Sequence, residues 1–417
     1  MMWKIEKSKT KKNTLLLNGR YLYSRYDPES DVAKFLSKEI KNENNKFLLL
    51  GLGLGYHAKY ILDKFKNSKI FIILISTDEI NICEQHGMKE VLDDKRLIIL
   101  NKNFNMLQED ISKMQLIVPL AWVKAIGMEH PLYVLLEVIK TNQLSFKEQG
   151  FLMKENFESN VKLGDSTISK TNVANGRAFL VSAGPSLDLT IKLIKQYNNK
   201  AFILSVGSAL QTLLKNNIIP DAVIISDATS RLTNQFNYKE YKGLLFYLST
   251  ANHEVVKNHA GLKVILFQQN YNLSEKFAEM YSAPLLDTGG SVATLALSLL
   301  EFLNFNEVYL FGQDLGFEHN RTHATHSASN TSLINSINQK HLIANNGEMI
   351  NTRSDFITFK YWFEQKAITT NMKIYNTSYM GAKIKNIPYI SQQLFEFHFS
   401  KVPQKDLSFL EKYINTL

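Results

Sequence analysis

The chain has 417 residues, of which 45% are hydrophobic and 21% are charged, and its formal net charge is +9. At roughly 100–200 residues per domain, this length predicts two or three domains, and the composition excludes disordered and collagen-like proteins. The single cysteine, Cys83, excludes a disulfide scaffold and a multi-cysteine zinc or iron–sulfur site, and its sequence neighbours predict a small buried side chain.

Positive charge on this scale suits an anionic ligand, a nucleotide or a membrane surface. The lysines are scattered, however, and the chain carries no recognisable nucleic-acid module, so we predict a solvated surface and no nucleic-acid partner. No apolar run reaches the ~20 residues of a membrane span, and no apolar segment of a signal peptide follows the basic N-terminus. We therefore expect a cytoplasmic protein with no transmembrane segment.

The first predicted domain covers residues 1–127. A buried strand at Phe47–Leu50, a glycine turn at Gly51–Gly55 and a helical pattern at 56–62 are followed by strands at 69–75 and 96–100. This order is typical of a small Rossmann-like α/β domain. The glycine turn resembles a cofactor loop, but Ser76 and Thr77 follow the second strand where an acidic residue is expected. We therefore favour a structural domain over a cofactor-binding one.

A helical connector is predicted over residues 128–175, because apolar residues recur there at helical spacing, and a helical hairpin is the expected form. The second α/β domain, over 176–385, has predicted strands at 178–182, 201–205, 222–226, 244–248, 263–267 and 307–311. Predicted helices cover 187–196, 208–215 and 291–303. This pattern predicts a central, doubly wound Rossmann-like sheet.

The rest of this domain and the C-terminal segment are less regular. Residues 313–350 are polar and predict a long loop. A helix is expected from Ser354, as its N-cap, to about Ile368, and a short strand at 373–375. Short helices are expected over the final segment, 386–417.

Ligands of open parallel sheets bind beyond the carboxyl ends of the strands. After the strand at 178–182, Gly184 permits close backbone approach, Pro185 restricts φ, and Ser186 is a good N-cap ahead of Asp188. The helix that begins here would present N–H groups and a positive dipole end to a phosphate. An ordinary capped turn is the competing interpretation.

Other strand ends carry similar residues. They are Gly207, Ser208, Asp227, Gly290, Ser291, Gly312, Gln313 and Asp314. Because several loops of glycine, serine and aspartate meet at one edge of the sheet, the sequence predicts a nucleotide site there.

Several other sites are excluded. The chain lacks the P-loop sequence GxxxxGK[ST] and the Asp-x-Asp pair that holds a metal in many glycosyltransferases. His253 and His259 are six residues apart, so they do not share a helix face as zincin ligands do. His319, His323 and His326 allow a metal site, but we favour a loop that faces solvent or substrate. As an alternative, one of these histidines acts as a general base.

An ordered set of motifs resembles the motility-associated Maf flagellin glycosyltransferases. The set comprises Gly51–His57, Ala183–Asp188, Gly207–Leu210, Ile219–Asp221 with Asp227, Gly289–Val292, Gly312–Phe317, Thr322–His323, Asn376–Thr377 and Gly381–Ala382. The resemblance spans about residues 45–385. The chain departs from the family in being shorter after the central domain, and in having Gly316 before Phe317 where the family has alanine.

The resemblance implies a central domain like those of archaeal 6-hydroxymethylpterin diphosphokinase and bacterial sialyltransferases. It also implies transfer of a nonulosonic acid, pseudaminic or legionaminic acid, from a CMP-activated donor to Ser or Thr of flagellin, in support of flagellar assembly and motility. The Gly184–Ser186 turn would then bind the CMP phosphate, and Ser208, Asp227 and Gln313 would contact the nucleoside. Asp314 and His323 are equal candidates for the catalytic base. The full set of donor-binding residues that the resemblance implies is Gly184, Pro185, Ser186, Asp188, Gly207, Ser208, Asp227, Gly290, Ser291, Gly312, Gln313 and Thr377.

No cofactor is required by this chemistry, since CMP carries its own phosphate as leaving group, and the need for a divalent metal stays open. Two alternatives remain. One is a pterin-type diphosphokinase that uses ATP and Mg²⁺, and the other is a non-catalytic flagellin-binding protein.

Overall fold

A computed structural model describes residues 2–40, 46–100, 114–127, 130–169, 176–236, 241–317, 321, 323–327, 340–408, 410 and 414–415. It divides into two compact units, Met1–Leu144 and Ser145–Leu417. The division falls within α6 (Pro131–Asn160), one continuous helix of 30 residues. The expected helical hairpin is therefore wrong: after Pro131 this stretch contains no proline and only one glycine, so nothing in it ends the helix.

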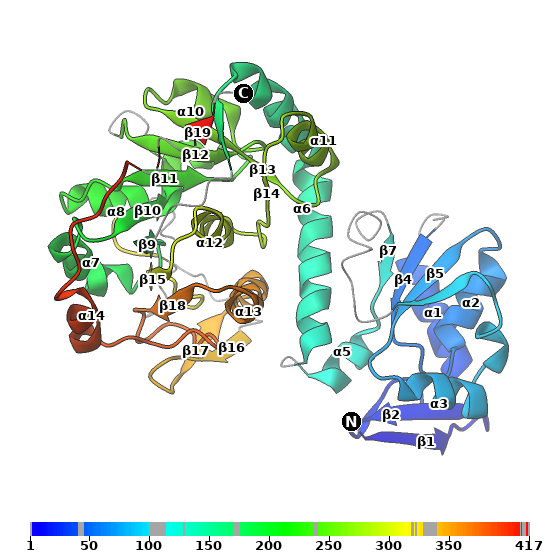
Figure 1. The fold of residues 1–417 in the computed structure, drawn as a ribbon. Helices are drawn as coiled ribbons and strands as arrows, with labels where there is room; N and C mark the ends of the chain where they lie inside the picture. Colours follow the sequence, from blue (N-terminus) through cyan, green and yellow to red (C-terminus); the bar gives the residue numbers. More distant parts are fainter. Residues whose placement is uncertain are drawn as a thin grey trace. The chain divides into compact units, whose positions relative to one another are not determined.

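The N-terminal unit is built around a four-stranded parallel sheet with the order β6-β5-β4-β7 (Figure 1). Its strands are β4 (Lys46–Leu50), β5 (Lys69–Ile73), β6 (Leu97–Leu100) and β7 (Gln115–Ile117). Its helices are α1 (Pro28–Glu39), α2 (Tyr56–Lys64), α3 (Asp78–His86) and α5 (Leu120–Ile126), with a short 3-10 turn at Lys89–Val91. The predicted order of strand, glycine turn, helix and strand is confirmed, and Cys83 is buried as expected.

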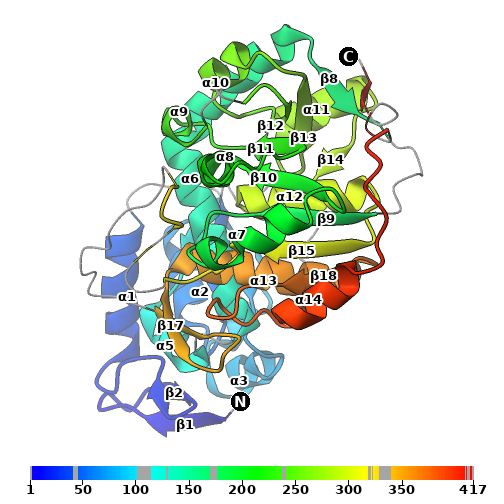
Figure 2. The ribbon, with the colours of Figure 1, turned by 90° about the vertical axis from the view of Figure 1, so that its left-hand side faces the viewer.

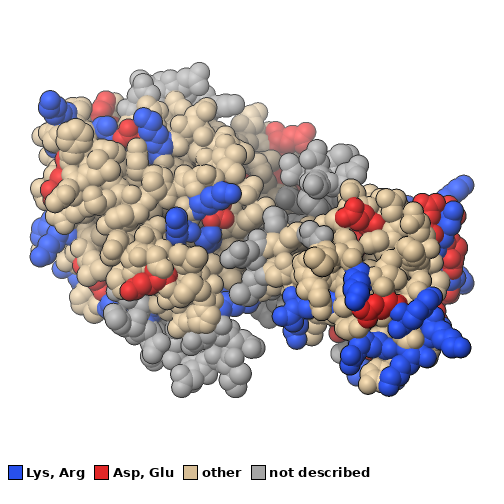
Figure 3. Space-filling view, turned by 90° about the horizontal axis from the view of Figure 1, so that it is seen from below, with Lys and Arg blue, Asp and Glu red and all other residues tan. Residues whose placement is uncertain are grey.

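An antiparallel sheet, which the sequence analysis did not predict, precedes this unit's parallel sheet. It consists of β1 (Trp3–Lys7), β2 (Asn13–Leu17) and β3 (Arg20–Tyr21). Figure 3 views the molecule from the side of these strands and shows lysine and arginine side chains gathered on them. The exposed basic residues are Lys4, Lys7, Lys9, Lys11, Arg20 and Arg25. Lys4 is paired with Glu6 at 2.6 Å, so part of this charge is neutralised locally.

The second unit contains a ten-stranded sheet with the order β18-β15-β9-β10-β11-β12-β13-β8-β19, and β14 pairs with β13. All neighbouring strands are parallel except β19, which runs antiparallel to β8. The strands are β8 (Ser166–Ile168), β9 (Arg177–Val181), β10 (Phe202–Val206), β11 (Ala222–Ile225), β12 (Leu244–Leu248), β13 (Lys263–Gln268), β14 (Leu285–Leu286), β15 (Glu307–Phe311), β18 (Lys373–Asn376) and β19 (Ile414–Asn415). The six strands predicted for this domain and its doubly wound α/β class are confirmed.

Helices cover both faces of this sheet. They are α7 (Leu187–Gln196), α8 (Leu210–Lys215), α9 (Leu232–Gln235), α10 (His253–Asn258), α11 (Asn272–Met280), α12 (Val292–Phe302), α13 (Ser354–Thr369) and α14 (Gln392–Phe399). In Figure 1, α12 and α13 lie on one side of the sheet, and Figure 2 shows α7, α8 and α14 in front of its other side.

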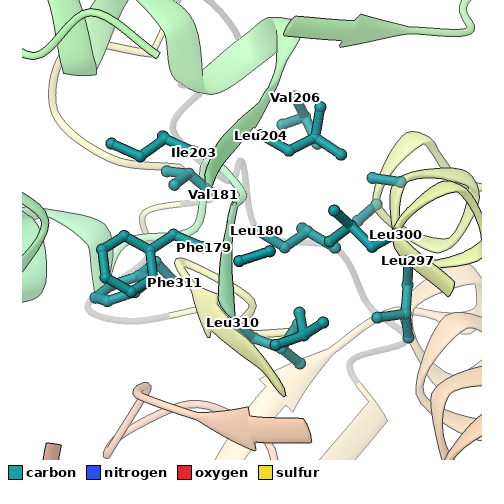
Figure 4. Close-up of a cluster of buried hydrophobic side chains, with 14 of the residues drawn as sticks. Phe179, Leu180, Val181, Ile203, Leu204, Val206, Leu297, Leu300, Leu310 and Phe311 are labelled. Atoms are coloured by element: carbon teal, nitrogen blue, oxygen red, sulfur yellow. The ribbon is translucent and has the colours of Figure 1, made fainter. Parts of the chain in front are cut away.

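Side chains that alternate along the central strands form the core between these layers (Figure 4). Leu180, Leu204 and Leu310 point toward Leu297 and Leu300 of α12. On the opposite face, the Phe179 ring lies 5.8 Å from the Phe395 ring and 5.3 Å from the Phe399 ring, between centroids. The near-continuous apolar strands thus reflect a sheet that is buried on both faces.

Two expectations for the C-terminal part are corrected. The polar stretch after residue 313 ends in a hairpin of β16 (Lys340–Ile343) and β17 (Met349–Thr352) rather than a loop. Its strands are short and only partly buried, so they lack the apolar run that marks a buried strand. Residues 386–417 contribute β19 as well as α14, and Arg353, not Ser354, occupies the N-cap position of α13.

The end of α6 is fastened to the carboxyl ends of β11 and β12 by two buried asparagines one turn apart. The Asn156 side-chain amide donates to the carbonyls of Ala228 and Thr250, at 2.9 and 3.2 Å. The Asn160 amide donates to the carbonyls of Ser249 and Ala251, at 3.0 and 2.8 Å. These bonds satisfy strand-end carbonyls that would otherwise be buried without donors.

None of the described helices is both long and apolar enough to span a bilayer.

Candidate functional site at the sheet's switch point

The order of the strands reverses beside β9. From β9 the chain moves outward through β10 to β13, and then returns to place β15 on the other side of β9. In doubly wound sheets, ligands bind in the crevice at such a reversal. The two loops that leave β9 and β15 run side by side here, since the Ser182 N–H donates to the Phe311 carbonyl and the Gly184 N–H to the Gly312 carbonyl, both at 2.8 Å.

An open cavity lies at this reversal. Its walls come from the ends of β9, β10 and β15, the start of α12, part of α13 and the segment around His323. The lining residues are Ser182, Ala183, Gly184, Val206, Ser208, Ser291, Val292, Ala293, Gly312, Gln313, Asp314, Leu315, Gly316, His323, Phe356 and Phe359. The predicted convergence of strand ends on one site is thus what the fold produces.

Seven of the candidate site residues line this cavity: Gly184, Ser208, Ser291, Gly312, Gln313, Asp314 and His323. Pro185, Ser186, Asp188, Gly207 and Gly290 lie on the same loops or beside them in sequence but are not part of its wall. Thr377, which follows β18, is not part of the wall either. Asp227 is not part of the wall either, and its carboxylate accepts the N–H and the hydroxyl of Thr229, at 2.8 and 2.9 Å. The Thr377 hydroxyl donates to the Leu310 carbonyl at 2.9 Å, which makes it a link between β18 and β15.

Asp314 is packed tightly at the floor of the cavity. A Cβ at Gly184 would lie 2.1 Å from Asp314 Oδ2, and a Cβ at Gly381 would lie 2.9 Å from Asp314 Oδ1. Gly312 has φ +62°, and a Cβ there would lie 2.2 Å from the Ser182 carbonyl oxygen. Glycine is therefore required at these positions by the close approach of the segments that follow β9, β15 and β18.

The start of α7 differs from the expectation. Ser186 does not cap the helix with its hydroxyl, which instead lies 2.6 Å from the Ser378 hydroxyl. The buried Asp314 carboxylate instead accepts the N–H of Ser186 itself, with its Oδ2 at 3.0 Å from the nitrogen. The N–H groups of Gly184 and Ser186 are thus bonded within the protein, although both were expected to bind a phosphate.

The start of α12 faces the cavity more openly. Ser291 and Thr294 form a capping box, in which the Ser291 hydroxyl accepts the Thr294 N–H at 3.1 Å. The next two residues of this first turn, Val292 and Ala293, line the cavity. Helical geometry gives the N–H groups of a first turn no partner within the helix, so this end of α12 suits an anion.

Two polar and aromatic features of the site were not predicted. The Ser182 hydroxyl donates to Gln313 Oε1 at 2.7 Å and thereby orients the Gln313 amide. Phe356 and Phe359, on α13, form an aromatic wall, and the Arg353 guanidinium lies 4.1 Å from the centre of the Phe356 ring. Their spacing of three residues marked a packed helix face, but nothing in the sequence indicated that α13 folds over the strand ends.

His323 is held at the cavity by the residues that follow it. The Ala324 N–H donates to the Ala183 carbonyl at 2.8 Å, and the Ser327 hydroxyl donates to the Ser208 carbonyl at 3.0 Å. His319 lies outside the described residues. Among the residues that the structure does describe, no three His, Cys, Asp or Glu side chains are grouped as metal ligands would be.

The glycine loop of the N-terminal unit is filled by the protein itself. The buried Glu79 carboxylate accepts the N–H groups of Leu52, Gly53, Ile75 and Ser76, at 2.6, 2.8, 2.5 and 3.2 Å. The Trp122 ring covers the loop, since a Cβ at Gly51 would lie 2.0 Å from it. Burial raises the pKa of Glu79 to about 7, while the four N–H groups favour its charged form. These contacts support the structural interpretation of this domain.

A second buried titratable group, His57, lies beside this loop. Its ring is surrounded by those of Tyr23, Phe35 and Trp122, and its Nδ1 has no hydrogen-bond partner among the described residues. Burial lowers the pKa of His57 to about 3. In the unfolded chain, the His57 ring binds a proton with the ordinary pKa of about 6.5. The contribution of the buried neutral ring to the free energy of unfolding is therefore complete above that pH and is lost as the pH falls toward 3.

We expect this histidine to make the N-terminal unit acid-sensitive. Between pH 7.5 and pH 5.0, the free energy of unfolding of the natural protein should fall by about 2 kcal/mol relative to that of His57→Leu. Urea unfolding of the intact proteins at both pH values, read by hydrogen exchange in residues 46–100, measures the difference. Because the two proteins are compared at the same pH, the contributions of other titrating groups to the free energy of unfolding cancel. A difference that does not change with pH would mean that His57 is accessible to protons in the folded state.

Comparison with known proteins agrees with this architecture. A family model described as "6-hydroxymethylpterin diphosphokinase MptE-like" matches residues 152–320, which include the strand ends around the cavity. The MAf glycosyltransferase from Magnetospirillum magneticum AMB-1 is similar in structure, with 18% sequence identity and a TM-score of 0.53, over 99% of this chain and 73% of that chain. No curated protein matches the chain. The resemblance expected from the motifs is confirmed at the level of the fold, and residues 152–320 match the MptE-like family model.

Proposed function

We propose that the chain is a glycosyltransferase that moves a nonulosonic acid from a CMP-activated donor to Ser or Thr hydroxyls of flagellin in the cytoplasm. The observation that carries the proposal is the cavity at the sheet reversal, where Gln313, Asp314 and His323 lie together. The fold shared with a Maf glycosyltransferase supports the same reaction class. The nonulosonic acid, pseudaminic or legionaminic, and the flagellin acceptor come from the resemblance of the motifs.

The donor phosphate is best accommodated at the start of α12. The N–H groups of Gly184 and Ser186 are already bonded to Gly312 and Asp314, whereas Val292 and Ala293 begin a helix that opens on the cavity. The aromatic wall of Phe356 and Phe359 offers a surface on which a pyrimidine base or the apolar face of a sugar can pack. The Gln313 amide, oriented by Ser182, supplies a polar contact.

In the proposed step, the bond between the anomeric carbon and the phosphate oxygen breaks, and CMP leaves with the bonding electrons. The acceptor hydroxyl oxygen bonds to the anomeric carbon, and a base takes its proton. We assign this base to His323, because imidazole titrates near neutral pH and the Asp314 carboxylate is already engaged by the Ser186 N–H. Asp314 would then hold the loop geometry of the site.

A second candidate is diphosphate transfer from ATP with Mg²⁺, and the MptE-like match over residues 152–320 favours it. In that reaction an acceptor hydroxyl attacks the β-phosphorus of ATP, and AMP leaves. The two reactions differ in the nucleotide they use and in the need for a metal, so measurements of nucleotide binding with and without Mg²⁺ distinguish them.

The test is thermal unfolding with CMP and with ATP, each with and without Mg²⁺. We expect CMP alone to raise the Tm, since a ligand at 100 times its Kd stabilises the folded state by about 2.7 kcal/mol. Gln313→Ala should abolish this shift, and Glu275→Ala, on α11 and outside the cavity wall, should leave it unchanged. A shift only with ATP and Mg²⁺ would replace the proposal by diphosphate transfer.

Flagellin incubated with CMP-pseudaminic or CMP-legionaminic acid and the protein should gain the mass of the sugar. Binding without mass gain for either donor would indicate a non-catalytic binding protein.

A further inference from the structure

We infer that Asp188 is a positioning residue that holds the His323 segment at the cavity, rather than a donor-binding residue. The expected effect of Asp188 on kcat rests on the proposed function. Its role in holding the His323 segment is argued from contacts alone. Asp188 is the second residue of α7, and its side chain is 24% exposed. It was expected to contact the donor, yet it does not line the cavity.

The Asp188 carboxylate is directed to the segment that carries His323. Its two oxygens lie 3.3 and 3.0 Å from the Thr325 N–H, and Oδ2 also accepts the Thr325 hydroxyl at 2.7 Å. Arg321 Nη1 lies 3.3 Å from the same oxygen. Asp188 therefore contacts the chain on both sides of His323.

Two further hydrogen bonds complete this attachment. They join Ala324 to Ala183 and Ser327 to Ser208, so residues 324–327 are bonded to the loops that follow β9 and β10. Ala324 is fully buried, which places its neighbour His323 at the cavity margin. Asp188 supplies the charged contact of this set, and charge-assisted hydrogen bonds are the stronger ones.

A carboxylate in the first turn of a helix also interacts favourably with the helix dipole, so a purely structural role must be distinguished. The control is Glu275→Ala, because Glu275 lies in the first turn of α11 and also accepts a loop N–H, that of Asn270 at 2.7 Å. This variant also removes a first-turn carboxylate and its hydrogen bond to a loop N–H, but at a helix that does not contribute to the cavity wall.

The structural test is hydrogen exchange of the intact protein. In Asp188→Ala, the amides of Ala324 and Thr325 should exchange at least about tenfold faster, while the amides of β9 and β15 keep their rates. Glu275→Ala should leave Ala324 and Thr325 unchanged. Unchanged exchange of these two amides in Asp188→Ala would overturn the inference, and this readout does not depend on any catalytic activity.

The kinetic test is a double-mutant cycle with His323. Asp188→Ala should lower kcat for sugar transfer by up to about 10²-fold with little change in the KM for the CMP donor, because a misplaced base loses efficiency while the donor contacts remain. In a His323→Ala background the same change should have no further effect. Losses that multiply in the double variant would show that Asp188 acts independently of His323 and would also overturn the inference. Absence of transfer in the natural protein would instead contradict the proposed function and leave the exchange result intact.

Discussion

His323→Ala is expected to lower kcat for transfer by about 10²–10⁴-fold, the range that a positioned general base contributes. The reason is that the acceptor hydroxyl must lose its proton as the anomeric carbon is attacked, and His323 is the imidazole that lines the cavity within the described residues. The KM for the CMP donor should change little, since the base acts on the acceptor. Steady-state kinetics with the CMP donor and flagellin measure both quantities.

Asp314→Asn is the matched variant for this prediction. Asparagine retains a side-chain oxygen that can accept the Ser186 N–H, so the loop geometry is kept while the charge is removed. We expect a loss of less than about tenfold in kcat, well below that of His323→Ala. The reverse order, with Asp314→Asn the more damaging change at unchanged thermal stability, would assign the base to Asp314.

The second large effect is expected in the N-terminal unit. Glu79→Ala removes the acceptor of four N–H groups at the glycine loop and at the end of β5. Each buried donor left without a partner costs about 1–3 kcal/mol, and a typical domain is stable by only about 5–15 kcal/mol. We therefore expect this unit to be largely unfolded at 37 °C, which hydrogen exchange of residues 46–100 would report.

Glu84→Ala is the control, because Glu84 lies on the same helix, α3, and is 47% exposed in its ion pair with Lys89. Exposed pairs of this kind contribute about 0–1 kcal/mol, so its loss should change stability by less than that. If Glu79→Ala lowered stability no more than Glu84→Ala does, the carboxylate would not be what holds the glycine loop.

Local sequence pattern was enough to predict most strands of the two large sheets, but not the short strands β7, β8, β14 and β19. Runs such as Phe47–Leu50 and Val308–Phe311 are apolar along their whole length because both faces of these sheets are covered, and such runs can be recognised without a structure. The same pattern missed the hairpin β16–β17 and the antiparallel strands β1 and β3, whose side chains are mostly exposed or only partly buried, and it also missed the short buried strand β2.

The sequence also indicated which loops form the site, since Gly184, Ser208, Ser291 and Gly312–Asp314 follow strands that end at one edge. It did not indicate which groups these residues contact. The Asp314 carboxylate reaches the start of α7 across 128 positions, and Glu79 fills a glycine loop that by itself resembles a cofactor site.

Residue type and spacing therefore determined the class of fold and the edge of the sheet that carries the site. Only the tertiary structure decided whether a backbone N–H faces a ligand or an internal carboxylate. The physical reason is that hydrogen-bond donors at glycine turns and helix starts are generic, whereas their partners come from segments far away in the chain. The Asp188 contact with Thr325, which places His323, depends on tertiary packing in the same way.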